Sequence, residues 1–354
     1  MVVYITATAL SILFAYISTH IGNSHQLKSQ AKRMLSRTFA FLSFLPLTLI
    51  SAVRFNVGTD FMSYRRMFIV QSFNPTEPGF ALFARVLYFI SKYPQIFFIA
   101  SSIFICAGYY IAIYRESISP AYSIFIFFTT SNCYFSSLNL IRQHMATALL
   151  LNALSMYRRK KYKEAMILAL IATTVHNSSI LAVIALVSID LLKLTPFRGA
   201  MVIAISMIAA RVLSTFFRSI IARYTTYGKY LYETGANTYI AVILVFICFY
   251  ILLSYIYGKV KTNDAIRILF SSVQTALIIG GSVAVLFTPA NRLMYYYEAV
   301  LVLYVPEALK NIDRKYVKYA MYVLVTAAYV LKIVLYFRGD WYNTYFHYRT
   351  IWSD

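Results

Sequence analysis

FAFLSFLPLTLISAVRFNVGTDFMSY, residues 39–64, decides how this chain is built. Its first part, Phe39 to Val53, is apolar, and its second part, Arg54 to Tyr64, is polar, glycine-containing and charged. Such a boundary is typical of a helix that leaves the hydrocarbon core of a membrane. A chain that only had to cross the bilayer would have no use for Arg54 and Asp60 paired at this point.

The whole composition agrees with a membrane chain. Of the 354 residues, 60% are hydrophobic and 13% are charged, which excludes a soluble domain with a charged surface. Repeated apolar runs approach the roughly 20 residues that cross a bilayer, and runs of this length predict helices, because barrel strands are shorter. The predicted fold is all-α: one multi-pass membrane domain over residues 1–354, with about twelve transmembrane helices. The runs are 2–19, 38–53, 95–113, 119–135, 138–157, 164–177, 178–192, 199–213, 237–257, 266–287, 290–306 and 317–337.

Three further features refine this picture. Met1 to Thr19 lacks a basic leader region and a small-residue cleavage site, so it predicts a first spanning helix and no signal peptide. Gly79 to Ser91 is too short to span and predicts an interfacial or re-entrant helix. The two runs around 164–192 predict a tight helical hairpin with a polar tip at His176. The three cysteines are widely spaced in apolar runs, form no metal pattern and indicate small core residues.

Lys and Arg predict the orientation, because short cytoplasmic connections are enriched in them. The densely basic connections lie at 28–37, 115, 158–163, 193–198, 259–267 and 310–318. The other connections then face outward, and so do both ends of the chain. These outward connections are 54–93, 136–142, the His176 tip, 211–236 and 288–292. All the polar breaks therefore fall on one side of the membrane, where they describe a single site.

The charge balance indicates what this site binds. The chain carries a formal charge of +21, and its outward segments are basic, although outward loops normally avoid such charge. The basic residues are scattered between spans and do not gather on one soluble face, which argues against nucleic acid as a partner. We therefore expect an anionic ligand on the outer face, besides contact with the lipid bilayer.

Near residue 60, each motif has a structural and a functional interpretation. Gly58 permits a tight turn that folds Arg54 and Asp60 back toward the membrane. Alternatively, Arg54 only snorkels to the headgroups and Asp60 is a turn residue. Tyr64 follows on a predicted short helix. Glu77, before a Pro-Gly turn, is either a solvated acid or a general base, and the sequence leaves this open.

Later in the chain, Arg142 and Gln143 begin a long apolar helix. An arginine at the entrance of a span is costly unless it pairs or faces a cavity, and its planar fork suits phosphate oxygens. Asn139 is interpreted as the cap of that helix or as a sugar contact. His176 is interpreted either as a structural histidine or as a group that accepts a hydroxyl proton or hydrogen-bonds to pyrophosphate.

Two outward segments complete the set of candidates. Residues 215–236 interleave basic and aromatic side chains, including Arg223 and Tyr227. They indicate either an interfacial aromatic belt or a surface that binds phosphate and stacks on sugars. Arg292 opens another predicted span. No phosphate-loop glycine pattern, zinc spacing or Ser-His-Asp elbow appears, so the energy for a reaction would arrive in the substrate.

In their order, these motifs resemble the EpsG-like, Wzy-type bacterial polysaccharide polymerases. The resemblance rests on Arg54 with Gly58-Thr59-Asp60 and Tyr64, on Glu77-Pro78-Gly79-Phe80, on Asn139 with Arg142-Gln143, and on His176. It covers residues 50–190 well and the remainder only by hydropathy and Arg292.

The resemblance implies an inner-membrane glycosyltransferase whose active site faces the periplasm. Its substrate would be an oligosaccharide repeat linked to undecaprenyl pyrophosphate. The enzyme would transfer the growing glycan to the non-reducing end of the next lipid-linked repeat. The product would be O-antigen, capsule or exopolysaccharide, and the family suggests a chain-length-regulating co-polymerase as a partner.

On this hypothesis, Arg142 and Arg292, helped by Arg54 and Arg223, grip the departing pyrophosphate. Asp60, Glu77 or His176 would deprotonate the acceptor hydroxyl, and Asp60 and His176 are favoured. Tyr64, Asn139, Gln143 and Tyr227 would contact substrate. Arginines would take the place of a metal, no cofactor would be needed, and single displacement would invert the anomeric centre.

Three other functions stay open, one of them a non-catalytic structural subunit, which full activity of Arg142→Ala would favour. A lipid-linked oligosaccharide flippase would place charges at the membrane midplane, often in two related halves, and no convincing internal repeat is visible here. An O-antigen ligase would share the arginine chemistry but use a different acceptor.

Overall fold

Helices make up almost all of the computed structural model, which describes residues 1–23, 29–74, 77–213, 250–258, 264–286, 292–338 and 342–352 and the single residues 216, 219, 220 and 223. The first helices are α1 (Val2–Asn23), α2 (Ser29–Ala52), α3 (Phe61–Val70), α4 (Pro78–Ile90), α5 (Gln95–Glu116), α6 (Pro120–Thr129), α7 (Tyr134–Asn139) and α8 (Ile141–Arg158). They are followed by α9 (Tyr162–Val175), α10 (Ser179–Leu192), α11 (Pro196–Val212), α14 (Asp264–Leu286), α15 (Arg292–Glu298), α16 (Leu301–Lys310), α17 (Lys315–Arg338) and α18 (Tyr342–Tyr345). The all-α prediction is confirmed for the described residues.

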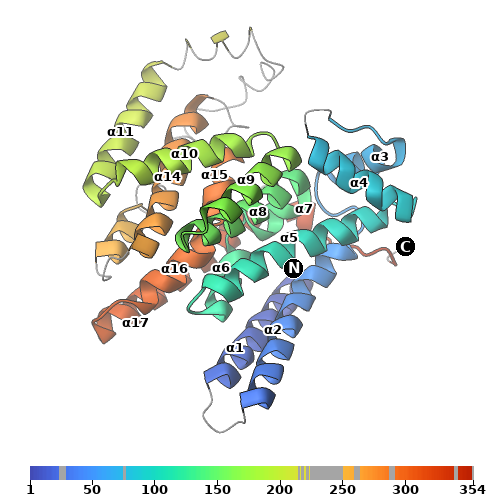
Figure 1. Ribbon diagram of the computed structural model, residues 1–354, viewed down its shortest axis with the longest axis horizontal. Helices are drawn as coiled ribbons and strands as arrows, with labels where there is room; N and C mark the ends of the chain where they lie inside the picture. The colour runs from blue at the N-terminus through green and yellow to red at the C-terminus, as the bar shows by residue number, and fades with distance from the viewer. Residues whose placement is uncertain are drawn as a thin grey trace. The chain divides into compact units, whose positions relative to one another are not determined.

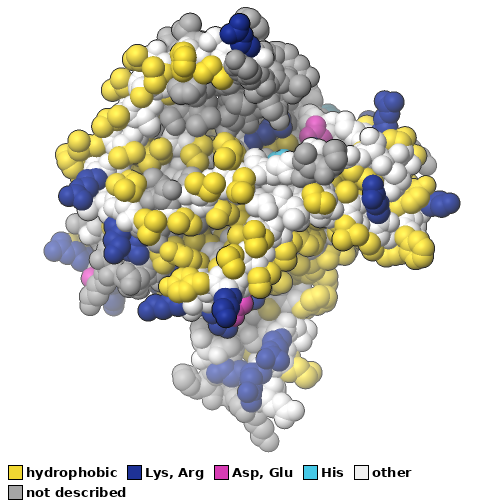
Figure 2. Space-filling model, turned by 45° about the horizontal axis from the view of Figure 1, so that its top comes forward, with side chains coloured by type: hydrophobic (Ala, Val, Ile, Leu, Met, Phe, Trp, Pro, Cys, Tyr) yellow, Lys and Arg dark blue, Asp and Glu magenta, His cyan; other side chains and the backbone are white. Residues whose placement is uncertain are grey.

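Four described helices are long and apolar enough to cross a membrane: α1, α2 from Gln30 onward, α5 and α17. Shorter apolar helices accompany them, among them α4 and α6. Hydrophobic side chains cover much of the face drawn in Figure 2, as expected for a surface that meets lipid. The chain is therefore a membrane protein, whereas the predicted count of twelve spans is not confirmed.

Two predicted spans are broken in the structure. Run 119–135 forms α6 and α7, separated by a turn at residues 130–133. The break coincides with polar residues, because Thr130, Ser131 and Asn132 interrupt the apolar run there. Run 290–306 divides into α15 and α16, with a turn at residues 299–300. Of run 237–257, only residues 250–257 lie within the described part of the chain.

The chain divides into two compact units. The first unit comprises residues 1–180, 305–307 and 322–354, and the second comprises residues 181–304 and 308–321. In the second unit, α11 packs on α14, and α14 packs on α15. The prediction of a single membrane domain stays a prediction.

In the first unit, α1 and α2 lie side by side, and α2 also packs against α5 (Figure 1). Next to them, α5 packs against α8 and α8 against α9. The short helix α4 rests on both α5 and α9. As a result, the N-terminal ends of α4 and α8 and the C-terminal end of α9 approach one another.

The segment after α2 turns inward and is closed by the C-terminal residues. The backbone N–H of Phe55 donates to the carbonyl of Arg349 at 2.9 Å, and that of Ile351 donates to Val53 at 3.1 Å. Arg54 is 1% exposed and donates to Ser102 Oγ at 3.1 Å. The expectation that Arg54 pairs with Asp60 is wrong, because the buried guanidinium donates to neutral oxygens of Ser51, Ser102 and Leu138.

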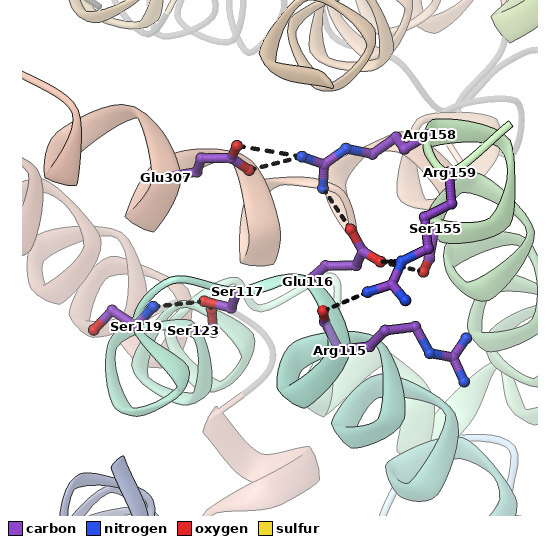
Figure 3. A network of polar contacts seen from close by, with 9 residues as sticks. All are labelled: Arg115, Glu116, Ser117, Ser119, Ser123, Ser155, Arg158, Arg159 and Glu307. Atoms are coloured by element: carbon purple, nitrogen blue, oxygen red, sulfur yellow. Dashed lines mark hydrogen bonds and ion pairs between the residues drawn. The ribbon is translucent and has the colours of Figure 1, made fainter. Parts of the chain in front are cut away.

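At the other end of α5 and α8, buried charges join three helices (Figure 3). Arg158 of α8 contacts Glu116 of α5 at 3.1 Å and Glu307 of α16 at 3.0 Å. Arg159 also binds Glu116, at 2.7 Å, and Ser155 donates to the same carboxylate. Part of the basic cluster at 158–163 therefore joins helix ends.

Candidate active site

Glu77 lies at the centre of a cluster that three helix ends form. One carboxylate oxygen, Oε2, accepts a hydrogen bond from Nη1 of Arg142 at 2.5 Å. The other, Oε1, lies 2.6 Å from Nδ1 of His176. The Glu77 side chain is only 3% exposed, whereas those of Arg142 and His176 are 33% and 24% exposed. A buried carboxylate thus holds two partly exposed groups side by side.

Local sequence explains why Glu77 reaches this position. Pro78 occupies the first turn of α4, where its missing N–H costs nothing, and Glu77 is the residue before it. A Cβ on Gly79 would lie 2.2 Å from Oγ1 of Thr174, near the end of α9. Glycine is therefore required for α4 to approach α9 this closely. This approach brings Glu77 to His176, the residue that ends α9.

Arg142 is the second residue of α8. Its guanidinium carbon lies 5.7 Å above the ring of Phe80, a cation–π contact that helps to fix the side chain. The Tyr64 ring, on α3, lies against the same Phe80, with centroids 6.4 Å apart, and Tyr64 interacts electrostatically with Arg142. Tyr64 and Arg142, both predicted from the sequence as site residues, are therefore brought together with Glu77.

The electrostatics keep Glu77 ionised. Burial acts to raise the pKa of Glu77, but the hydrogen bond from His176 and the charge of Arg142 outweigh it, so that the pKa falls below its ordinary value. Burial raises the pKa of Tyr64, and the neighbouring Arg142 opposes this. The Glu77 carboxylate is therefore an acceptor, and it is a weak base.

This charge state determines which nitrogen of His176 carries the proton. An ionised carboxylate only accepts hydrogen bonds, so Nδ1 of His176 must donate to Oε1 of Glu77. In the neutral imidazole, Nε2 then keeps its lone pair. A histidine held in this way can accept a proton from a substrate hydroxyl, as the histidine does in the Ser-His-Asp arrangement.

The same cluster can hold an anion. Arg142 donates to Glu77 through Nη1, and a third of its side chain stays exposed. It lies at the N-terminal end of α8, where the helix dipole favours negative charge. The arrangement therefore combines a proton acceptor with a site for phosphate oxygens.

Other predicted site residues lie elsewhere. Arg54, as described above, has almost no exposed surface with which to touch a ligand. Asn139 does not cap α8, because Leu140 occupies the cap position. The side chain of Asn139 donates instead to the hydroxyl of Tyr345. Asp60 is half-buried and accepts a hydrogen bond from Thr59 at 3.3 Å.

The remaining candidates are placed as follows. Gln143 is buried at the start of α8. Arg223 is exposed, and Arg292 is exposed at the start of α15, in the second unit. Tyr227 lies outside the described residues. The parts assigned to these four residues stay predictions.

One residue near the cluster was missed by reading the sequence. His144 is fully buried on α8, and neither ring nitrogen has a hydrogen-bond partner among the described residues. It lies close enough to His176 for the two charges to interact. The available signal was its spacing, two residues after Arg142 in an apolar helix.

Comparison with protein families finds a match to the EpsG family over residues 37–350. This range contains every residue of the cluster. No curated protein and no solved structure shows significant similarity to the chain.

Proposed function

Since the chain belongs to the EpsG family, a family of membrane proteins similar to exopolysaccharide polymerases, we propose that it joins oligosaccharide repeats linked to undecaprenyl pyrophosphate. The reaction takes place at the periplasmic face of the inner membrane and transfers the growing glycan to the non-reducing end of the next repeat. The observation that carries this proposal is Glu77, which holds a positioned histidine and an arginine at one place.

The residues divide the chemistry between them. Nε2 of His176 takes the proton from the acceptor hydroxyl, and that oxygen attacks the anomeric carbon of the growing glycan. The bond from this carbon to the pyrophosphate oxygen breaks, and its electron pair leaves with undecaprenyl pyrophosphate. Attack from the face opposite the leaving group inverts the anomeric centre.

Arg142 acts on the leaving group. Negative charge grows on the pyrophosphate as the bond breaks, and a fixed guanidinium in a site of low dielectric favours that state over the bound substrate. Glu77 keeps its charge and orients both partners. These contacts support His176 as the base and Glu77 as a positioning residue; the side chain of Asp60 instead accepts a hydrogen bond from its neighbour Thr59.

The test compares surface polysaccharide from a deletion strain with strains restored by wild type, Arg142→Ala or Arg65→Ala. Arg65, exposed on the neighbouring helix α3, is the matched control. We expect a ladder for wild type and Arg65→Ala and single repeats for the deletion and Arg142→Ala, because losing such a contact lowers the rate by roughly 10²–10³-fold.

Other results would contradict the proposal. A ladder in the deletion strain would exclude a polymerase. Total loss of surface glycan in the deletion strain would indicate a flippase. Free glycan of normal length that is no longer attached to its lipid core would indicate a ligase. A ladder of normal intensity from Arg142→Ala would exclude the assigned role of the arginine.

A further inference from the structure

An apolar groove of about 580 Å³ runs between α5, α8 and α9 in the first unit. This is within the range of roughly 300–1,000 Å³ that is usual for ligand pockets. Each helix contributes one face, because lining residues recur at intervals of three or four. They are Phe104, Ala107, Gly108, Ile111 and Arg115 of α5, Ala148, Leu149, Asn152 and Met156 of α8, and Glu164, Ile167 and Leu168 of α9.

The groove continues from the candidate active site. Leu149, Asn152 and Met156 follow Arg142 at intervals of seven, ten and fourteen residues, which places all four on the same side of α8. At 1.5 Å per residue, Leu149 lies roughly 10 Å along the helix from Arg142. A chain attached to a phosphate at Arg142 would therefore enter the groove as it runs along α8.

The surroundings of the groove fit a hydrocarbon chain. Its wall on α5 belongs to a helix long and apolar enough to span the membrane, and Ile111 there is 49% exposed. The polar side chain of Asn152 is turned to the protein, donating to the carbonyls of Gly108 and Ala148 at 2.8 and 2.9 Å. Charged residues, Arg115 and Glu164, occur only toward the end away from Arg142.

We propose that this groove binds the polyprenyl chain of the lipid-linked substrate while Arg142 holds its pyrophosphate. This inference rests on the proposed function for the identity of the lipid, but the groove itself can be tested without polymerisation. The groove and Arg142 together then favour the carrier over ordinary lipids, because those lipids have no pyrophosphate to place at Arg142.

The first experiment measures binding. A photoreactive benzoylphenylalanine replaces Ile111, in the groove, or Ile103, which is 46% exposed on α5 outside it. The full chain, in phosphatidylethanolamine and phosphatidylglycerol vesicles, is irradiated with labelled undecaprenyl pyrophosphate. We expect labelling at Ile111 that unlabelled undecaprenyl pyrophosphate removes and added phosphatidylglycerol does not. Equal labelling at the two positions, or competition by phosphatidylglycerol, would show that bulk lipid fills the groove and would overturn the inference.

The second experiment measures turnover with two carriers. Ala107→Trp fills the groove, and Ile103→Trp is the control on the same helix. With the undecaprenyl carrier, the KM of Ala107→Trp should rise about tenfold or more, since losing the burial of only two methylene groups has this effect. With a carrier of a single isoprenoid unit, which is too short to reach the groove from Arg142, the variant should equal wild type.

The results also separate the two proposals. If wild type polymerises neither substrate, the proposed function fails, while the labelling still decides whether the groove binds a polyprenyl chain. If Ala107→Trp matches wild type on both carriers, or is impaired equally on both, the groove does not hold the chain and the inference is wrong.

Discussion

At the scale of single residues, Glu77 explains most about the site. The sequence left it open whether Glu77 is a solvated turn acid or a base. The structure shows a third arrangement, in which the buried carboxylate of Glu77 contacts Arg142 and His176 at the same time. Burying a carboxylate is costly unless it is paired and hydrogen-bonded, and here both oxygens of Glu77 have a partner.

Glu77 also predicts how stability depends on pH. The pKa of Glu77 in the folded protein is below its ordinary value of 4.5. Ionised Glu77 therefore stabilises the fold fully above the pKa that it has in the unfolded chain, and this stabilisation is lost as the pH falls through the folded pKa. In detergent, the melting temperature of wild type should therefore fall more steeply than that of Glu77→Gln between about pH 5 and about pH 3. Parallel curves for the two proteins would contradict this assignment.

At the scale of elements, Gly79 lets α4 meet α9. Replacement by alanine places a Cβ 2.2 Å from Thr174 Oγ1, and the two helices must move apart. Glu77 lies at the end of α4 and His176 at the end of α9, so moving these helices apart separates the two side chains. Gly79→Ala should therefore lower the rate of polymerisation by roughly 10²-fold, the smaller of the effects usual for losing a positioned base. Adding Thr174→Ala removes the closest clash and should restore part of the activity. Unchanged chain length in the single variant would show that the close approach is not needed.

A second prediction concerns the ends of α5, α8 and α16. Arg158 contacts two carboxylates there, and its side chain is 6% exposed. Arg158→Met removes this positive charge from both buried carboxylates, leaving Arg159 as the remaining ion-pair partner of Glu116, and should lower the free energy of unfolding by about 3–5 kcal/mol. Chemical denaturation in detergent measures this change.

Combining Arg158→Met with Glu116→Gln and Glu307→Gln should recover much of that loss, because neither residue that contacted Arg158 then carries a buried charge, and Arg159, which also loses its partner, is 45% exposed. Lys161→Met, at an exposed neighbouring position, serves as the control. If the combined variant is no more stable than Arg158→Met alone, burial of unpaired charge is not the cause.

At the scale of the whole molecule, the proposed orientation can be measured. Single cysteines replace exposed Arg65, between α2 and α4, or exposed Lys161, between α8 and α9, after the native cysteines are changed to alanine. A membrane-impermeant maleimide should label Arg65→Cys in spheroplasts and Lys161→Cys only after lysis, because Lys161 belongs to a basic connection. The reverse pattern would place the cluster in the cytoplasm and exclude a periplasmic reaction.

Much of the fold was predictable because hydropathy and helical length are local properties. The spans at 2–19, 95–113 and 317–337 all appear as long helices. Run 119–135 was predicted as one span, but it breaks at residues 130–133, where three consecutive polar residues interrupt the apolar pattern. Gly58 was correctly predicted as a turn residue, since its φ of 101° is strained for any other side chain.

The sequence by itself determined a helical membrane protein with polar, basic breaks, because these properties follow from the order of residue types along the chain. It also identified Glu77, Arg142 and His176 as candidates. Only the tertiary structure decided that these three meet, that Arg54 is buried away from Asp60, and that a groove continues from Arg142. The physical reason is that such contacts join residues up to 99 positions apart and depend on how closely helices such as α4 and α9 pack, which no local pattern records.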